Sequence, residues 1–159
     1  MATLTVSITE SVTLNGKDHG GTYSGFSNTS ITQVEKRIIN ATTTETTLYA
    51  AADTQDDAQD QIYGGAAWDE DSVKYVRISN LAADSTFIYI TVSNKSNDEA
   101  VFKLYGKESF LLWRHAGSFE AIAGAATQTN VADISKVTVL ADTSTQAVEL
   151  FIASTAAAY

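Results

Sequence analysis

Near its start the chain alternates between apolar and hydroxyl-bearing side chains almost without interruption. The apolar positions are Leu4, Val6, Ile8, Val12 and Leu14. Glu10 is the single exception, and threonines and serines fill the positions between them. Because side chains alternate faces along a strand, this pattern predicts one extended segment with an apolar and a polar face. The segment ends at Asn15-Gly16, the pair best suited to the positive φ angles of a tight hairpin turn.

Similar short segments recur to the end of the sequence. Strands are predicted at 43–50, 73–81, 86–93, 100–105, 108–114, 134–141 and 146–153. Polar turns are predicted at 94–98, 105–107 and 142–145. The glycine- and serine-rich residues 20–30 are expected to form a loop. Residues 31–40 fit a strand or a helix equally well, and residues 116–131 give no clear pattern.

Short strands separated by frequent turns predict an all-β, antiparallel β-sandwich or jelly-roll-like single domain over residues 1–159. Proline is absent, and no regular amphipathic helices lie between the strands, which argues against an alternating βαβ fold. A long acidic loop is expected at about 51–72 and a flexible C-terminal tail at about 154–159. An alternative for the tail is an arm that orders against a neighbouring subunit.

The formal charge of −9 argues against nucleic acid as a partner, because neutralising phosphates requires lysine and arginine. No apolar stretch approaches the roughly 18 residues of a membrane span, and the first residues do not resemble a secretory signal, so export is not expected. The absence of cysteine excludes disulfides and zinc–thiolate sites. Acidic side chains are concentrated between residues 45 and 71, notably at Asp53, Asp56, Asp57 and Asp60. A solvated loop is the favoured interpretation, with a non-standard calcium site as the alternative.

No catalytic, cofactor-binding or metal-ligating residues are predicted. The only histidines, His19 and His115, lie far apart in sequence, and no G-x-S-x-G nucleophile motif is present. A hydrolase using Asp57 or His115 is the enzymatic alternative, and no substrate suggests itself. Aromatic side chains offer a sugar-stacking alternative, although such residues more often belong to a core or an interface. They are Tyr23, Tyr63, Trp68, Tyr75, Tyr89, Tyr105 and Trp113.

Four stretches together resemble small β-rich structural proteins in the virions of tailed bacteriophages, especially phages of aquatic bacteria. They are TLTVSITESVTLNG with the following KDHGG; ITQVEKRI; the pair VKYVRISNL and TFIYITVSN followed by GKESFLLW; and the closing VELFIAS. They span most of the chain.

This resemblance implies a non-enzymatic virion protein, made in the host cytoplasm and assembled into the particle. A capsid decoration protein that binds the major capsid protein on the outer surface is favoured. It would be a homo-oligomer, with a trimer as the favoured form. The alternative is a tail, neck or fibre component that recognises a host receptor or glycan. The resemblance supplies no site residues.

Overall fold

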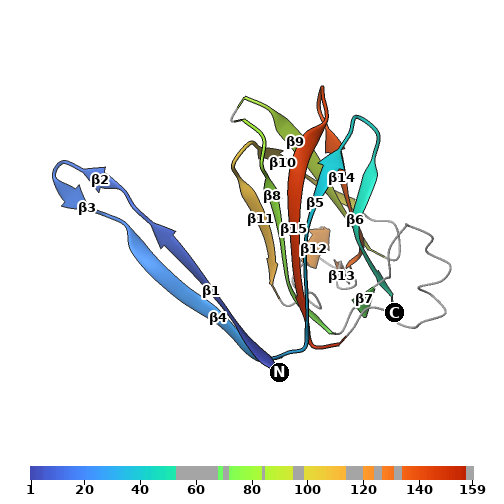
Figure 1. Cartoon of the computed structure of the whole chain (residues 1–159), viewed down its shortest axis with the longest axis horizontal. Coiled ribbons are helices and arrows are strands. Elements are labelled where there is room, and N and C mark those ends of the chain that lie inside the picture. The colour runs from blue at the N-terminus through green and yellow to red at the C-terminus, as the bar shows by residue number, and fades with distance from the viewer. Residues whose placement is uncertain are drawn as a thin grey trace.

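Alternating side chains make β-strands of most of the chain that the structure describes. The computed structural model describes residues 1–52, 68–69, 72–83, 85–94, 99–113, 120–123, 127–130 and 134–156, with the side chains of 52, 94, 113, 120–123 and 127–130 excepted. Every regular element in these ranges is a strand (Figure 1). The predicted all-β fold is therefore confirmed, with sheets that are consistent with a β-sandwich.

Two sheets form the body of the molecule. One contains β11 (Ser109–Trp113), β8 (Val73–Asn80), β15 (Gln146–Ser154) and β5 (Gln33–Ala41), in that order. The other contains β10 (Glu99–Tyr105), β9 (Phe87–Asn94), β14 (Ile134–Ala141), β6 (Thr46–Ala52) and β7 (Trp68–Asp69). Neighbouring strands are antiparallel, except for the short parallel pair β6–β7.

The core lies between the two sheets and follows the period of two that the sequence shows. On β15, Val148, Leu150 and Ile152 are fully buried, whereas Phe151 between them lies on the opposite face and is only partly buried. Isoleucines and valines of β8, β9 and β14 complete the same cluster. Each large apolar side chain buried in this way contributes about 1.5–3 kcal/mol, which makes this cluster the main source of stability.

Two buried amide side chains connect the sheets at one end of the sandwich. The Asn80 side-chain amide donates to the Leu104 carbonyl (3.2 Å) and to the Gln146 side-chain oxygen (3.1 Å). Gln146 in turn donates to the Phe87 carbonyl (2.8 Å), and the Asn80 side-chain oxygen accepts from the Ala82 N–H (3.0 Å). Both amides therefore satisfy their hydrogen-bonding groups while bridging from the four-stranded sheet to the five-stranded sheet.

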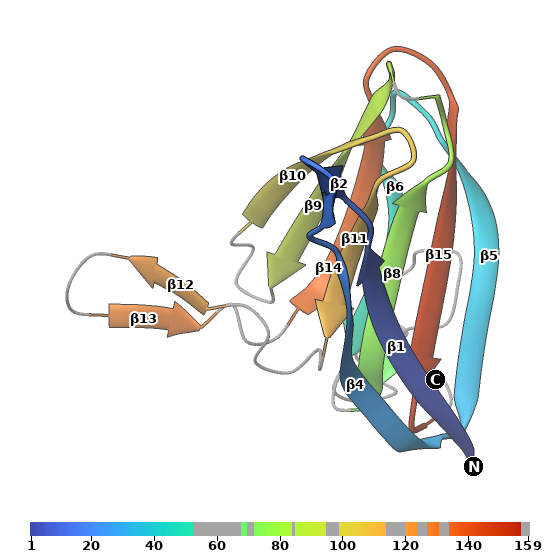
Figure 2. The same cartoon turned by 90° about the vertical axis from the view of Figure 1, so that its left-hand side faces the viewer.

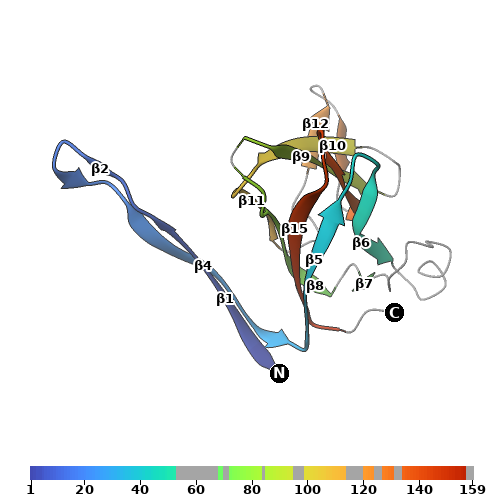
Figure 3. The ribbon, with the colours of Figure 1, turned by 45° about the horizontal axis from the view of Figure 1, so that its top comes forward.

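The first 31 residues form a long hairpin, here called the arm, that projects from the body (Figures 1 and 3). Its strands are β1 (Ala2–Glu10) and β4 (Gly21–Ile31), with β2 (Thr13–Leu14) and β3 (Lys17–Asp18) at the tip. The predicted turn is confirmed, because Asn15 (φ 53°) and Gly16 (φ 76°) both have positive φ between β2 and β3.

The expected loop at residues 20–30 is wrong, because this segment is strand β4. Each of its residues from Gly21 to Ser24 pairs with β1, and the register shifts twice, once beside Gly25 and once between Asn28 and Ile31. The predicted uninterrupted strand over 4–14 is also corrected, since it breaks between β1 and β2. There the Glu10 backbone passes so close to Gly20 that a Cβ on Gly20 would lie 2.1 Å from the Glu10 carbonyl oxygen. Both the strand at 21–31 and the break between β1 and β2 depend on pairing between distant residues, which cannot be inferred from local composition.

Two other segments left open by the sequence are now assigned. Residues 31–40 belong mainly to strand β5 rather than to a helix. Within 116–131 the backbone forms a separate hairpin of β12 (Glu120–Ala123) and β13 (Thr127–Asn130), which projects sideways from the body (Figure 2).

Residues 154–156 of the predicted tail lie within the described ranges. Ser154 is fully buried as the last residue of β15, and the Thr155 N–H donates to the Ser72 carbonyl (2.9 Å). The Ala156 N–H donates to the Ser154 hydroxyl (3.2 Å). Residues 157–159, and most of the expected acidic loop, lie outside the described residues.

Candidate functional site

The apolar face predicted for the first strand exists, but much of it is not buried within this chain. Seven of the ten large apolar side chains found exposed in the described ranges lie within the first 38 residues. They are Met1, Ile8, Val12, Leu14, Tyr23, Val34 and Ile38. Contiguous exposed apolar surface commonly marks an interaction site, so the arm and the adjoining face of β5 form the candidate functional surface.

The base of the arm packs against the outer face of the four-stranded sheet. Leu4, Val6 and Phe26 contact a small cluster that includes Tyr75 and Phe151, whose rings meet edge to face at 6.0 Å between centroids. Burial raises the pKa of the Tyr75 phenol, an effect that the positive charge of Arg77 partly opposes. The apolar side chains at the base of the arm are thus packed against the body of the same molecule.

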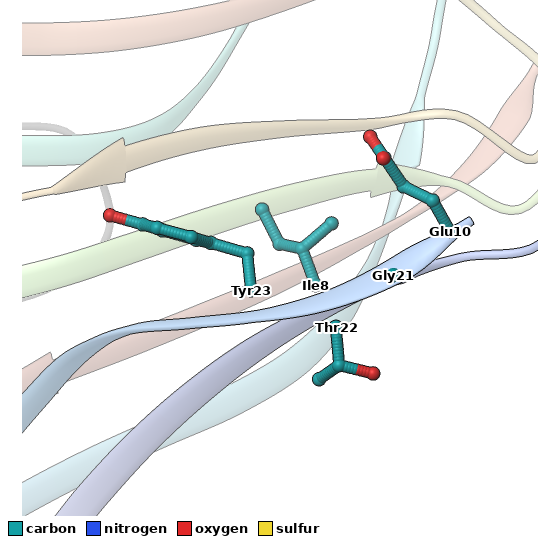
Figure 4. Close-up of a pocket in the computed structure, with 5 residues that line it drawn as sticks. All are labelled: Ile8, Glu10, Gly21, Thr22 and Tyr23. Atoms are coloured by element: carbon teal, nitrogen blue, oxygen red, sulfur yellow. The ribbon is translucent and has the colours of Figure 1, made fainter. Parts of the chain in front are cut away.

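Farther along, the arm diverges from the body and the same face becomes exposed (Figures 1 and 3). Ile8 is 39% exposed and Tyr23, its cross-strand partner, is 67% exposed. With Glu10, both side chains lie on one side of the ribbon, whereas Thr22 lies on the other (Figure 4). These residues and Gly21 line a shallow hollow of about 360 Å³.

A glycine shapes this exposed surface. Gly25 lies at the register shift of the arm, and a Cβ added there would lie 2.0 Å from the Tyr23 ring. The ring therefore lies directly across the Gly25 backbone. Tyrosine presents a large apolar surface with a polar tip, a combination that is enriched at protein interfaces.

The opposite face of the arm carries a row of paired hydroxyl groups. The Ser7 and Ser24 hydroxyls lie 3.3 Å apart, and those of Thr9 and Thr22 lie 3.2 Å apart. Such cross-strand pairs stabilise a ribbon modestly and keep this face compatible with water. The arm therefore has one polar face and one face suited to a partner.

An ion network lies on the outer face of the four-stranded sheet beside the arm. The Glu149 carboxylate pairs with Lys36 (Nζ–Oε2 3.0 Å) and with the Arg77 guanidinium. The hydrogen bond from Lys36 is the main cause that holds the pKa of Glu149 below its ordinary value, with Arg77 adding to the effect and burial opposing it. This network places two cations on a chain that is strongly acidic overall.

A second surface feature gathers aromatic side chains on β9 and β10. The Phe87 ring contacts those of Tyr89 and Tyr105 edge to face, with centroids 5.2 and 5.6 Å apart. Lys103 Nζ lies 3.5 Å from the Phe87 centroid and 4.8 Å from that of Tyr105. A hydrogen bond with Tyr105 is the main cause that raises the pKa of Lys103. Lys103 was not singled out from the sequence. The alternation of β10 places Lys103 and Tyr105 on one face, and pairing with β9 brings Phe87 beside them.

The aromatic residues proposed from the sequence as a sugar platform lie on different elements of the described chain. Trp68 and Tyr75 are each only 4% exposed, and Tyr23 lies on the arm. Tyr63 and the side chain of Trp113 lie outside the described residues. Tyr89 and Tyr105 both contact the Phe87 ring, and Trp113 is the cross-strand partner of Tyr75.

The histidines and the acidic run were the remaining candidates from the sequence. His19 is exposed near the tip of the arm, where its backbone N–H donates to the Val12 carbonyl (2.8 Å). His115, Asp57 and the rest of the acidic run at 53–60 lie outside the described residues. Within the described ranges, no group of three or more histidine or carboxylate side chains is placed to hold a metal ion. The same ranges contain no helix with the length and apolar character needed to cross a membrane.

Comparison with known proteins found no family model that matches this chain, and no significant match among curated proteins or solved structures.

Proposed function

We propose that this chain is a non-enzymatic structural protein of a tailed-phage virion, bound as an oligomer to the outer capsid surface. The observation that carries the proposal is the arm, a hairpin that leaves a β-sandwich with an exposed apolar face. A two-stranded hairpin by itself is only marginally stable in water, so an extended arm of this kind favours a protein that functions in an assembly. The virion context comes from the sequence resemblance.

The order of the strands supports a jelly roll, the two-sheet fold that occurs in viral capsid and lectin domains. Without β7, β12 and β13, eight strands of the body run from β5 to β15, and the two sheets have the orders 6-3-8-1 and 5-4-7-2. The first strand pairs with the last, the second with the seventh, the third with the sixth and the fourth with the fifth. This nested pairing is what results when a long antiparallel ribbon wraps into two sheets.

Quantitative mass spectrometry of purified virions tests the proposal. We expect this chain to be present, at a copy number comparable to that of the major capsid protein. A copy number far below that of the capsid protein would overturn the capsid assignment and favour the tail, neck or fibres. Virions that lack the chain would overturn the structural role itself.

The second candidate is a tail, neck or fibre component that recognises a host glycan, and the aromatic group around Lys103 is the observation that favours it. Aromatic rings offer apolar surfaces to sugar rings, and Tyr105 is 42% exposed. This candidate predicts binding on a glycan array that is lost in Tyr105→Ala and kept in Val101→Ala, an exposed change on the same face of β10. Equal binding by both variants, or no binding by the wild type, would contradict it.

A further inference from the structure

We propose that the arm is exchanged between copies of this chain, so that its exposed apolar face docks on the outer face of the four-stranded sheet of a second copy, along β5. The proposal names a surface and a partner, and it does not depend on where the protein acts. Four observations lead to a second copy as the occupant.

The first observation is that the two surfaces already fit each other within one molecule. Leu4, Val6 and Phe26 at the base of the arm pack on Tyr75 and Phe151 of the outer sheet face. The apolar row of the arm continues from these residues to Ile8 and Tyr23, which have no such cover. The distal half of the arm therefore carries the same kind of apolar side chains as the base, but there they are not packed against the body.

The second observation is that the outer sheet face also continues beyond the area that the arm covers. Val34 is 52% exposed and Ile38 is 64% exposed, with Lys36 between them on the same face of β5. β5 is an edge strand of its sheet, whereas the base of the arm packs against Tyr75 of β8 and Phe151 of β15. An apolar row beside the ion network thus remains open for an occupant from outside.

The third observation is charge. Lys36 and Arg77 against Glu149 leave a net charge of +1 (2 − 1) at this network, on a chain with a formal charge of −9. The arm carries Glu10 on the apolar side that would face it (Figure 4). Two copies of an acidic protein repel each other, and this pairing places a carboxylate of the arm near a network with a net positive charge.

The fourth observation is reach. Beyond the packed base, the arm segment from Ile8 to Leu14 spans about 23 Å at about 3.3 Å per residue, more than the width of four strands about 4.8 Å apart. Each copy has one arm that can dock and one outer sheet face along β5 on which the arm of another copy can dock. Repetition of such a contact closes into a symmetric oligomer when the rotation allows it.

Sedimentation velocity of the purified full chain over a range of concentrations tests the self-association. We expect the wild type to form an oligomer. In the double variant Ile8→Thr/Tyr23→Thr the association constant is expected to fall about tenfold or more, because two large apolar side chains that the contact would bury are removed. The matched control is Val101→Thr, an exposed position on β10 in the other sheet. A wild type that stays monomeric, or an equal loss in the control, would overturn the proposal. Thermal unfolding of each variant checks that the fold is retained.

Cysteine cross-linking tests the arrangement, since the wild-type chain contains no cysteine. Tyr23→Cys and Ile38→Cys are prepared separately, mixed and oxidised. We expect disulfide-linked heterodimers that need both variants. Two outcomes would contradict exchange: homodimers of Tyr23→Cys, which indicate arm-to-arm pairing, and closure within one chain in the Tyr23→Cys/Ile38→Cys double variant. Neither outcome bears on the virion proposal, which the copy-number measurement tests separately.

Discussion

At the scale of single residues, the buried amides of Asn80 and Gln146 link the two sheets of the sandwich through hydrogen bonds. Asn80→Ala removes a donor to the Leu104 carbonyl and to Gln146, and leaves buried groups without partners. Each buried group left unsatisfied costs about 1–3 kcal/mol, so we expect a loss of that size in the free energy of unfolding. Urea denaturation measures it.

The control for this prediction is Ser79→Ala, the preceding residue of β8. The Ser79 hydroxyl lies on the opposite face and bonds only the exposed Ser109 hydroxyl (2.8 Å), so we expect little change. Equal losses in Ser79→Ala and Asn80→Ala would show that the bridge between the sheets has no special role.

Glu149 predicts how stability depends on pH. Its pKa in the folded protein is below the ordinary value of 4.5, so its stabilising effect is complete above that value and is lost as pH falls through the folded pKa. Glu149→Gln is expected to lower the free energy of unfolding by about 0.5–1 kcal/mol at neutral pH, because both partner cations are partly exposed and solvent screens them.

The measurement for Glu149 is thermal unfolding of wild type and variant between neutral pH and pH values below its ordinary pKa. We expect the difference between them to shrink toward acid pH. Glu45→Gln, a change at an exposed position between β5 and β6, is the control. A difference that stays constant with pH would contradict the assigned ion network.

At the scale of elements, the turn from β10 to β11 is fixed by close approach of two backbone segments. A Cβ on Gly106 would lie 2.0 Å from the Ala83 carbonyl oxygen, and the Gly106 N–H donates to the Thr86 carbonyl (2.9 Å). Because backbone must move to admit a methyl group, Gly106→Ala is expected to cost about 1–3 kcal/mol of unfolding free energy.

Gly21→Ala is the matched control for this turn, since a Cβ there meets nothing within 4 Å. Chemical denaturation of both variants is expected to show a loss only for Gly106→Ala. An unchanged midpoint for Gly106→Ala would mean that the contact between the turn and residues 82–83 does not constrain the fold.

Little of the arm is supported by the rest of the molecule. Beyond its packed base it is a two-stranded ribbon with exposed side chains, so its tip is expected to open more often than the body. Limited trypsin digestion of dilute protein is expected to cut first after Lys17, beside the tip turn, and later after Lys136 in the central strand β14. Protection of Lys17 at high concentration would accompany exchange, and a first cut at Lys136 would contradict the prediction.

At the scale of the whole molecule, the nested pairing brings together residues far apart in the chain, as when Gln33 pairs with Ser154. Strand positions such as 73–81 and 134–141 were predicted closely, because alternation and turn residues are local properties. The loop expected at 20–30 failed for the opposite reason. Glycine and serine indicated a loop, and only the register with β1 makes that segment a strand.

The sequence predicted the apolar face of the candidate surface but not its exposure. The alternation from Leu4 to Leu14 identified an apolar strand face, and a buried position was the natural expectation for it. The structure shows Ile8 exposed and Leu4 packed, a difference between two residues that the pattern treats alike. Which of the two is buried depends on its distance from the body, and the alternation of side chains along a strand contains no information about that distance.

The sequence by itself determined that this chain forms strands, where most of them lie and which side chains share a face. It did so because side-chain alternation and turn propensity act over a few residues. Only the tertiary structure decided that Asn80 and Gln146 bridge the sheets, that residues 1–31 leave the body as an arm, and that part of an apolar face stays in water. Those outcomes depend on contacts between distant segments, whose geometry exists only once the chain has folded.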